Sequence, residues 1–182
     1  QYCDEVDACG VINGDGSTCG FQTCGELIEY VGYEYSTVQI GNQCWFAENL
    51  RSGYYSNGDE IASIPELNII NGTHYYQWHI VDDPRGLCPT EWHVPTVQEY
   101  ADVMSEANGT LLSPHPYDGQ LMGYLGYGVS INLLSTHELS WTSTPDGESG
   151  AFRFAQNYIF TEGLASNPIT NGETVRCIKN VE

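Results

Sequence analysis

YSTVQIGNQCWF, residues 35–46, carries the clearest strand signal in the chain. Its first half, Tyr35–Ile40, is rich in β-branched and aromatic residues, which favour strands. The dipeptide Gly41-Asn42 is a turn signal, and Gln43–Phe46 returns as a second apolar run. Two such runs joined by a two-residue turn predict an antiparallel β-hairpin.

The clearest helix signal lies near the middle of the chain. Thr96 can cap a helix, and Glu99 stands three residues later, which is the spacing of a capping box. Asn108-Gly109 can end the helix, because glycine readily takes the left-handed C-cap conformation. We therefore predict one helix over about residues 97–107. Its apolar face would comprise Val97, Tyr100, Ala101, Met104 and Ala107.

The last third of the chain predicts an antiparallel meander. Residues 152–154 (FRF) alternate apolar and polar side chains, as a half-buried strand requires. Turn signals occur at residues 145–147 (PDG) and 171–172 (NG). With the hairpin and the helix, this pattern predicts an α+β fold. The expected strands are Leu139–Ser143, Ala151–Ala155, Tyr158–Thr161 and Thr174–Lys179.

Residues 1–25 differ from the rest of the chain in composition. They hold four of the seven cysteines, five glycines and few large apolar side chains. Such a segment cannot build its own core and needs disulfides, a metal or a docking surface. We therefore divide the chain into an N-terminal arm, residues 1–25, and a globular domain, residues 26–182.

The charge of the chain is strongly one-sided, with 24 acidic residues, five basic ones and a net charge of −19. Such a field repels phosphate backbones and anionic membranes, so we expect no nucleic-acid partner. The acidic residues either keep a secreted protein soluble or bind Ca²⁺, which prefers oxygen ligands. A calcium site in the arm would use Asp4, Asp7, Asn13 and Asp15. We expect no organic cofactor.

The seven cysteines indicate an oxidising compartment, because none forms a Cys-x-x-Cys pair and their spacing does not fit zinc. We interpret them as disulfides of an extracellular or cell-surface protein. Their number is odd, so at least one is a buried free thiol or is bonded to another molecule. No run reaches the about 18 apolar residues of a membrane helix. Since no signal peptide is present at Gln1, we expect a processed, secreted chain without membrane insertion.

Two kinds of surface group are predicted. The sequons that begin at Asn71 and Asn108 lie at polar breaks, where an asparagine would be exposed to glycosylation. Two tyrosine pairs either stack on sugars or a protein partner, or pack in the core. These pairs are Tyr54-Tyr55 and Tyr75-Tyr76.

The sequence does not indicate an enzyme. The five histidines are scattered, without an HExxH pattern, and no Gly-x-Ser-x-Gly elbow occurs. We expect His93 to form a hydrogen bond beside the start of the helix. The neighbouring acids Asp82-Asp83 and Asp59-Glu60 are typical of a solvated surface. We therefore predict no catalytic residues.

Four segments occur in an order typical of one family. They are YSTVQIGNQCWFAENLR (35–51), GLCPTEWHVPT (86–96), SWTST (140–144) and VRCIK (175–179). In this order they resemble the Fibrobacter succinogenes major paralogous domain of secreted bacterial proteins. The resemblance spans roughly residues 30–180 and implies a C-type-lectin-like α+β fold with small antiparallel sheets. It also implies disulfides between Cys88 and Cys177 and between Cys24 and Cys44.

The arm resembles Cys- and Asp-rich linker repeats that precede such domains in large surface proteins. Those repeats usually carry another cysteine at the position of Ile12. This departure leaves one of three arm cysteines unpaired. We expect a bond between Cys9 and Cys19, with Cys3 left for a bond to a neighbouring subunit.

Three classes of function can be compared with the sequence: an enzyme, a structural module and a binding module. A formylglycine-type enzyme is disfavoured, because Cys88 and Cys177 are explained by a bridge. The Glu-Pro-Asn and Trp-Asn-Asp segments of calcium-dependent lectins are absent from the sequence. We expect a non-catalytic, glycosylated structural module that assembles with copies of itself into an extracellular fibre through its arm. The alternative is an adhesion or glycan-binding module. Assembly should depend on calcium or salt, because the negative charge must be screened.

Overall fold

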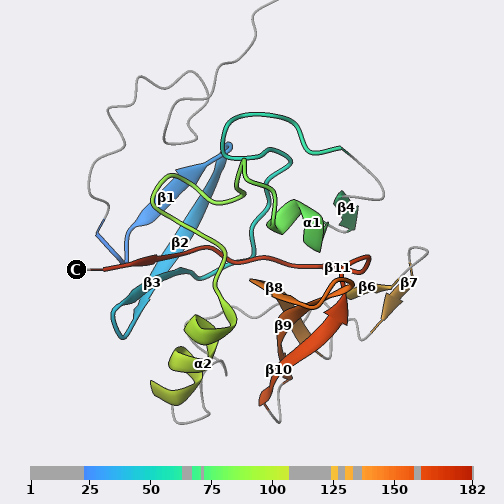
Figure 1. The fold of residues 1–182 in the computed structure, drawn as a ribbon. Helices are drawn as coiled ribbons and strands as arrows, with labels where there is room; N and C mark the ends of the chain where they lie inside the picture. The colour runs from blue at the N-terminus through green and yellow to red at the C-terminus, as the bar shows by residue number, and fades with distance from the viewer. Residues whose placement is uncertain are drawn as a thin grey trace, which may run out of the picture.

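Antiparallel sheet dominates the described part of the chain, as the computed structural model shows (Figure 1). Within it lie twelve strands in three sheets and two short helices. The α+β class predicted from the sequence is therefore wrong, and a C-type-lectin-like fold is not established. The described residues are 23–62, 67–70, 72–106, 124–126, 130–132, 137–157 and 161–181.

The first sheet contains the predicted hairpin. Strands β2 (Tyr33–Ile40) and β3 (Gln43–Phe46) pair antiparallel across the turn at residues 41–42, which confirms that prediction. Strand β1 (Leu27–Tyr30) adds to β2, and β12 (Ile178–Asn180) adds to β3. The start and the end of the described chain therefore meet in one sheet, in the order β1-β2-β3-β12.

Strand β1 was not predicted, because its four residues are too few to show a clear hydrophobic period. A tight turn joins β1 to β2. Tyr30 pairs with Tyr33 across the turn formed by Val31 and Gly32. Both turn residues have positive φ, 51° for Val31 and 72° for Gly32. A turn of this kind matches the twist of the flanking strands, but a β-branched residue is disfavoured in it.

The second sheet is formed by strands in the order β10-β9-β8. Strands β8 (His137–Asp146) and β9 (Gly150–Asn157) contain the two strands predicted near residues 139 and 151. The third predicted strand, Tyr158–Thr161, lies outside the described residues except for Thr161. The observed strand β10 (Thr161–Pro168) begins there.

The third sheet was not predicted. Its order is β4-β5-β11-β6-β7, so segments far apart in the sequence lie side by side. A short helix, α1 (Trp78–Val81), follows β5 directly. The strands are β4 (Leu67–Ile70), β5 (Thr73–Gln77), β11 (Gly172–Glu173), β6 (Tyr124–Gly126) and β7 (Ser130–Asn132).

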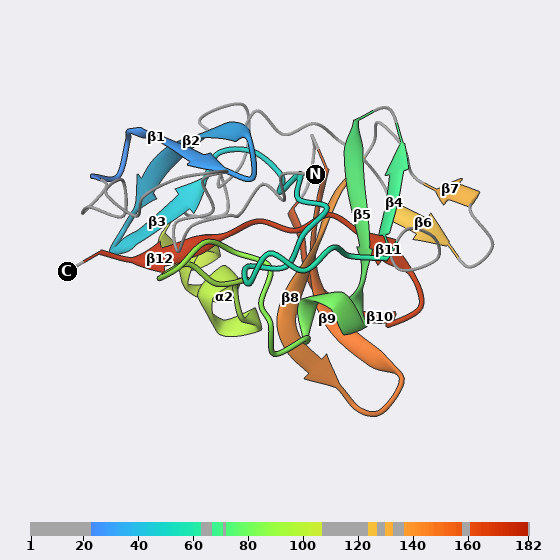
Figure 2. The same cartoon turned by 90° about the horizontal axis from the view of Figure 1, so that it is seen from above.

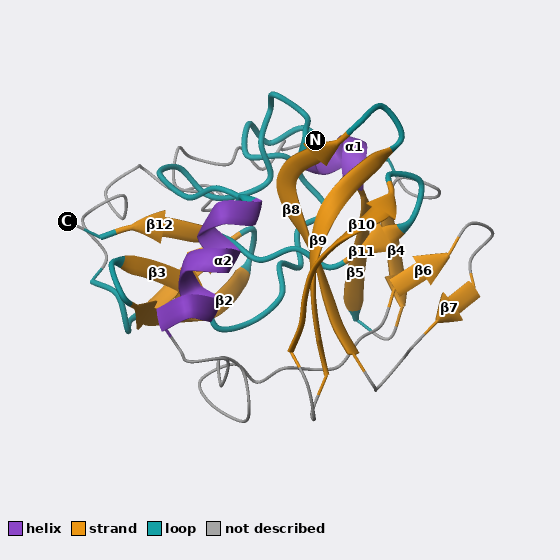
Figure 3. Ribbon diagram, turned by 60° about the horizontal axis from the view of Figure 1, so that its bottom comes forward, coloured by secondary structure: helices purple, strands orange, loops and turns teal. Residues whose placement is uncertain are grey.

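Helix α2 (Val97–Glu106) confirms the helix predicted from the capping box. The Thr96 amide donates to Glu99 Oε2 at 2.7 Å, and the Glu99 amide donates to Thr96 Oγ1 at 3.2 Å. The helix lies beside the first and second sheets (Figure 3). Tyr100 anchors it there, with ring centroids 5.1 Å from Trp45 and 4.7 Å from Phe154.

Two disulfides tie the domain together. Cys24 bonds Cys44 in β3, and Cys88 bonds Cys177 just before β12. These are the pairings that the family resemblance implied. The second closes a loop of 89 residues, which corresponds to about 4–5 kcal/mol of stabilisation in the chain-entropy treatment of the unfolded state.

Candidate functional site

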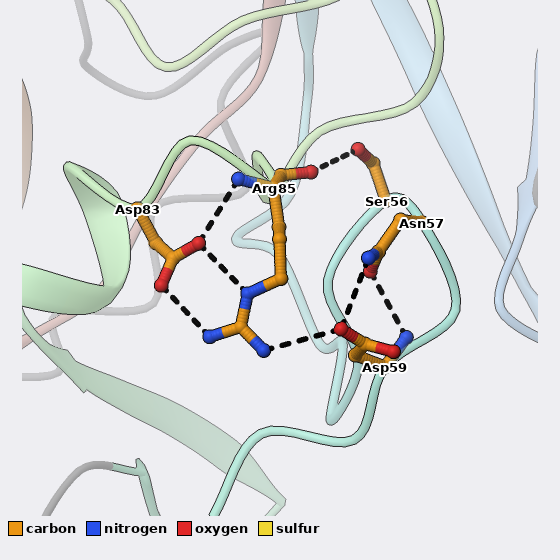
Figure 4. A network of polar contacts seen from close by, with 5 residues as sticks. All are labelled: Ser56, Asn57, Asp59, Asp83 and Arg85. Atoms are coloured by element: carbon orange, nitrogen blue, oxygen red, sulfur yellow. Dashed lines mark hydrogen bonds and ion pairs between the residues drawn. The ribbon is translucent and has the colours of Figure 1, made fainter.

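An exposed arginine holds together two loops on the surface (Figure 4). Arg85 Nε and Nη2 donate to the two carboxylate oxygens of Asp83, each at 2.8 Å. Its Nη1 donates to Asp59 Oδ2 at 3.2 Å, and its guanidinium carbon lies 3.7 Å from the centre of the Tyr55 ring. We call Asp59, Asp83 and Arg85 the Arg85 clamp. Because two-point carboxylate binding fixes orientation, the clamp joins the loop around residue 57 to the segment after α1.

Further hydrogen bonds fix the same loop. Ser56 Oγ donates to the carbonyl of Arg85 at 2.6 Å, and the Ser56 amide donates to the carbonyl of Gly86 at 2.9 Å. Asn57 closes the turn, since its Oδ1 accepts from the Asp59 amide and its Nδ2 donates to Asp59 Oδ2, both at 3.0 Å. The two loops therefore form one surface unit.

In the Arg85 clamp, hydrogen bonds stabilise the charged form of both carboxylates. Hydrogen bonds from the Arg85 side chain and amide lower the pKa of Asp83 to about 2. The hydrogen bond from the side-chain amide of Asn57, and after it the one from Arg85, lowers the pKa of Asp59. Two ionised carboxylates thus face one guanidinium at neutral pH. The expectation that Asp59 and Asp83 are merely solvated is wrong, although both remain at the surface.

An open groove lies beside the clamp. Its volume is about 370 Å³, and the segment from Pro84 to Val94 forms most of its wall, with Ser56 and Ser143 on the other sides. This volume lies at the small end of the about 300–1,000 Å³ typical of ligand pockets.

One residue of the groove wall has a strained backbone. The Trp92 amide donates to the carbonyl of Pro89 at 2.9 Å, which closes a turn over residues 89–92. Within this turn Glu91 has a φ of 70°. A residue with a side chain costs about 1–2 kcal/mol in this left-handed region. Glu91 is exposed and lines the groove.

His93 lies at the junction of the groove and α2. Its Nε2 is 2.7 Å from Glu99 Oε1, so the expected hydrogen bond beside the helix start is confirmed. Burial raises the pKa of Glu99, but hydrogen bonds from His93 and Thr96 outweigh it and lower the pKa. The His93 backbone exchanges two hydrogen bonds with Ile178, at 2.8 and 2.9 Å. His93 therefore has a structural role.

A buried carboxyl group joins the second and third sheets. Glu173 in β11 is fully buried, and its Oε1 accepts from Arg153 Nη1 at 2.8 Å and from Asn167 Nδ2 at 2.5 Å. Its Oε2 is also buried and has no hydrogen-bond partner. Burial raises the pKa of Glu173 to about 7, although Arg153 and Asn167 oppose this. No sequence signal marked this residue, because its partners come from β9 and β10.

Of the two alternatives for the tyrosine pairs, packing in the core holds for three of the four rings, and the binding surface is wrong for these three. Tyr55, Tyr75 and Tyr76 are buried, and only Tyr54 is exposed, at 40%. Tyr55 packs beneath Arg85, and Tyr76 donates its hydroxyl to the Ser52 carbonyl at 2.8 Å. These rings serve the core.

The other predicted sites lie outside the described residues. They are the calcium ligands Asp4, Asp7, Asn13 and Asp15, the arm cysteines Cys3, Cys9 and Cys19, and the sequons at Asn71 and Asn108. Within the described ranges, no three His, Cys, Asp or Glu side chains gather as metal ligands. No helix of the described chain is long and apolar enough to cross a bilayer.

All five basic side chains are engaged within the molecule. Arg51 and Lys179 lie over aromatic rings, 4.7 Å from the centre of Tyr33 and 5.3 Å from that of Trp92. Arg85 belongs to the clamp, and Arg153 binds Glu173. The buried Arg176 donates to the carbonyl of Ala47 at 2.6 Å. The acidic residues therefore dominate the surface charge.

Two edge strands expose apolar side chains. Leu27 on β1 and Ile69 on β4 are both 57% exposed, and β1 and β4 are outer strands of different sheets. These strands lie at opposite ends of the molecule (Figures 1 and 2).

Part of the chain, which includes the Arg85 clamp, is similar to a known protein family. A search of curated proteins finds no match to the chain. Residues 38–113 match the family described as the Fibrobacter succinogenes major domain, and this range includes the Arg85 clamp, the wall of the groove and α2. The disulfides fit a bacterial extracellular protein. Residues 38–113 are thus similar to the Fibrobacter succinogenes major domain, a family that suggests an extracellular structural or surface domain.

Proposed function

We propose that the protein is a non-catalytic structural domain whose copies assemble head to tail into an extracellular fibre or surface assembly. The observation that carries the proposal is the pair of edge strands at opposite ends, each exposing one large aliphatic side chain. Among the described residues, the large hydrophobic side chains exposed to solvent are Leu27, Tyr54 and Ile69. Two of these three lie on edge strands.

An edge strand offers unpaired amides and carbonyls to a strand of another chain. Contact between β1 of one copy and β4 of the next would join two different surfaces. Such a contact forms a ring if the rotation between copies closes and a filament if it does not. Leu27 and Ile69 would lose their exposed surface in this contact.

The position of the N-terminal arm in the sequence supports a role for it in the contact between copies. The arm leads into β1, and the Cys24–Cys44 disulfide fixes the point where it joins the sheet. We place the arm in the contact between copies, with Cys3 available for a bond between subunits. Since each copy carries a net charge of −19, assembly should require calcium or salt to screen repulsion. Glycans at Asn71 and Asn108 belong to the same proposal, and the intact mass of the secreted protein tests them.

Sedimentation velocity of the full chain with Ca²⁺ present tests the assembly. We expect species heavier than 20.1 kDa that grow with protein concentration. Leu27→Ser and Ile69→Ser should each leave the chain monomeric, because each removes one of the two edges that meet. Tyr54→Ser is the matched control, because Tyr54 is exposed but lies between strands. A wild-type monomer at all concentrations, or an equal effect of all three substitutions, would contradict the proposal.

The alternative of a glycan-binding module has less support. It rested on exposed tyrosine pairs, and three of the four rings are buried. A glycan-array experiment with the full chain would restore it if Tyr54→Ser abolished binding to a defined sugar.

A further inference from the structure

We propose that the groove beside the Arg85 clamp binds a lysine or arginine side chain of a separate, basic polypeptide, with the Glu91 carboxylate as its acceptor. This site goes beyond the proposed assembly, because it uses neither edge strand. Three observations support it: the volume of the groove, the charge around it and the backbone conformation of Glu91.

The groove has room for a long side chain. Its volume of about 370 Å³ is small for a ligand pocket, and it is open to solvent. The segment from Arg85 to His93 lines the groove, together with Ser56 and Ser143. An extended peptide could therefore pass over the mouth and insert one side chain.

The charge around the groove favours a cation. Arg85 is the basic residue of its lining, and the carboxylates of Asp59 and Asp83 already bind its guanidinium. Glu91 adds a further carboxylate. Lys179 lies over the Trp92 ring of the lining, but the three carboxylates of Asp59, Asp83 and Glu91 outnumber the two cations, so the surroundings of the groove are net negative. An anionic ligand would meet repulsion here, and a cationic one attraction.

The backbone of Glu91 indicates that its side chain is not selected for folding. Positive φ occurs at eight described glycines and at only two other described residues, Val31 and Glu91. Gly86, which also lines the groove, has a φ of 73°, and glycine is the residue that usually takes such a conformation. At this position of a turn glycine or asparagine is favoured. Strained residues concentrate at functional sites, and the proposal gives the carboxylate of Glu91 such a function.

Other occupants fit less well. A sugar would need a free aromatic face, but the Trp92 ring contacts Phe46 at 4.8 Å and Lys179 at 5.3 Å. A second copy would need a basic side chain to donate, and all five are engaged internally. The partner is therefore a different, more basic chain.

Amide-shift titration of the ¹⁵N-labelled full chain tests the site. The probes are blocked tripeptides with a central lysine, arginine or glutamine. We expect saturable shifts at residues 90–93 with the lysine and arginine peptides, weaker at high salt, and none with the glutamine peptide. Equal shifts with all three peptides, or saturable shifts elsewhere only, would overturn the proposal.

Two variants separate binding from folding. Glu91→Gln should weaken binding of the lysine peptide about tenfold, as loss of a charge-assisted hydrogen bond implies. Glu91→Gly should weaken it similarly and raise Tm, because glycine relieves the backbone strain. Glu148→Gln, which removes an exposed acid between β8 and β9, is the charge-matched control and should leave binding unchanged. A lower Tm for Glu91→Gly would mean that Glu91 serves the fold, and the proposal would be wrong.

Discussion

Replacing Glu173 by glutamine should flatten the dependence of the unfolding free energy on pH. Burial raises the pKa of Glu173 from 4.5 to about 7. Between these values the unfolded chain has lost the proton while the folded chain keeps it. Since the folded state then binds more protons, stability is greatest below about pH 4.5 and falls as pH rises to about 7.

The size of the effect follows from the same two values. The difference between 7 and 4.5, at about 1.36 kcal/mol for each pKa unit, gives a loss of about 3 kcal/mol across the interval. Glutamine keeps the acceptor for Arg153 and Asn167 but does not titrate. The variant should therefore lack this loss.

Urea unfolding, followed by tryptophan fluorescence at several pH values from 4.5 to 8, measures this change in the unfolding free energy. Trp45 and Trp141 are fully buried and report on the core. Burial lowers the pKa of His74, which gives a contribution of opposite sign near its usual 6.5. The quantity to compare is therefore the difference between wild type and Glu173→Gln at each pH. If this difference does not change between pH 4.5 and 7, the buried carboxyl does not titrate as described.

Three further predictions concern stability, and a fourth concerns hydrogen exchange in one loop. Val31→Gly should stabilise the protein by about 0.5–1 kcal/mol in the same urea assay, because the turn residue has positive φ; a loss would mean that the valine side chain packs usefully. Gly86→Ala should cost about 1–2 kcal/mol, since φ is 73° and the new Cβ would lie 3.1 Å from Ser56 Oγ; a neutral result would show that the loop yields. Replacing both Cys88 and Cys177 by alanine should lower the unfolding free energy by up to about 4 kcal/mol, and an unchanged denaturation midpoint would contradict this. Arg85→Ala should speed hydrogen exchange in the loop around residue 57 with little change in Tm, and unaltered exchange would show that the clamp does not order the loop.

Local signals were predictable from the sequence. Of the contacts between distant segments, the family resemblance implied the two disulfides, but nothing predicted the strand pairing of the third sheet. The hairpin of β2 and β3 and the helix α2 each follow from a short stretch with its own turn or cap. The third sheet joins β5 to β11, about a hundred residues later, and no local pattern specifies such pairing. Short strands such as β1 and β11 carry too few residues to show a period. The share of sheet was therefore underestimated.

The candidate site shows the same division. Asp83 lies two residues from Arg85 and suggests a local pair, but Asp59 lies 26 residues away. The sequence left open whether Tyr75 and Tyr76 face solvent or pack in the core, and both are buried in β5. The positive φ of Glu91 has no sequence signal, since glycine is the usual residue there.

The most direct test of head-to-tail assembly is sedimentation of mixed variants. Leu27→Ser leaves the β4 edge intact, and Ile69→Ser leaves the β1 edge intact. Each variant alone should remain a monomer of about 20.1 kDa with Ca²⁺ present, and the mixture should form dimers and nothing larger. Dimers of either variant alone would show that like edges pair, and a mixture that stays monomeric would show that β1 and β4 do not meet.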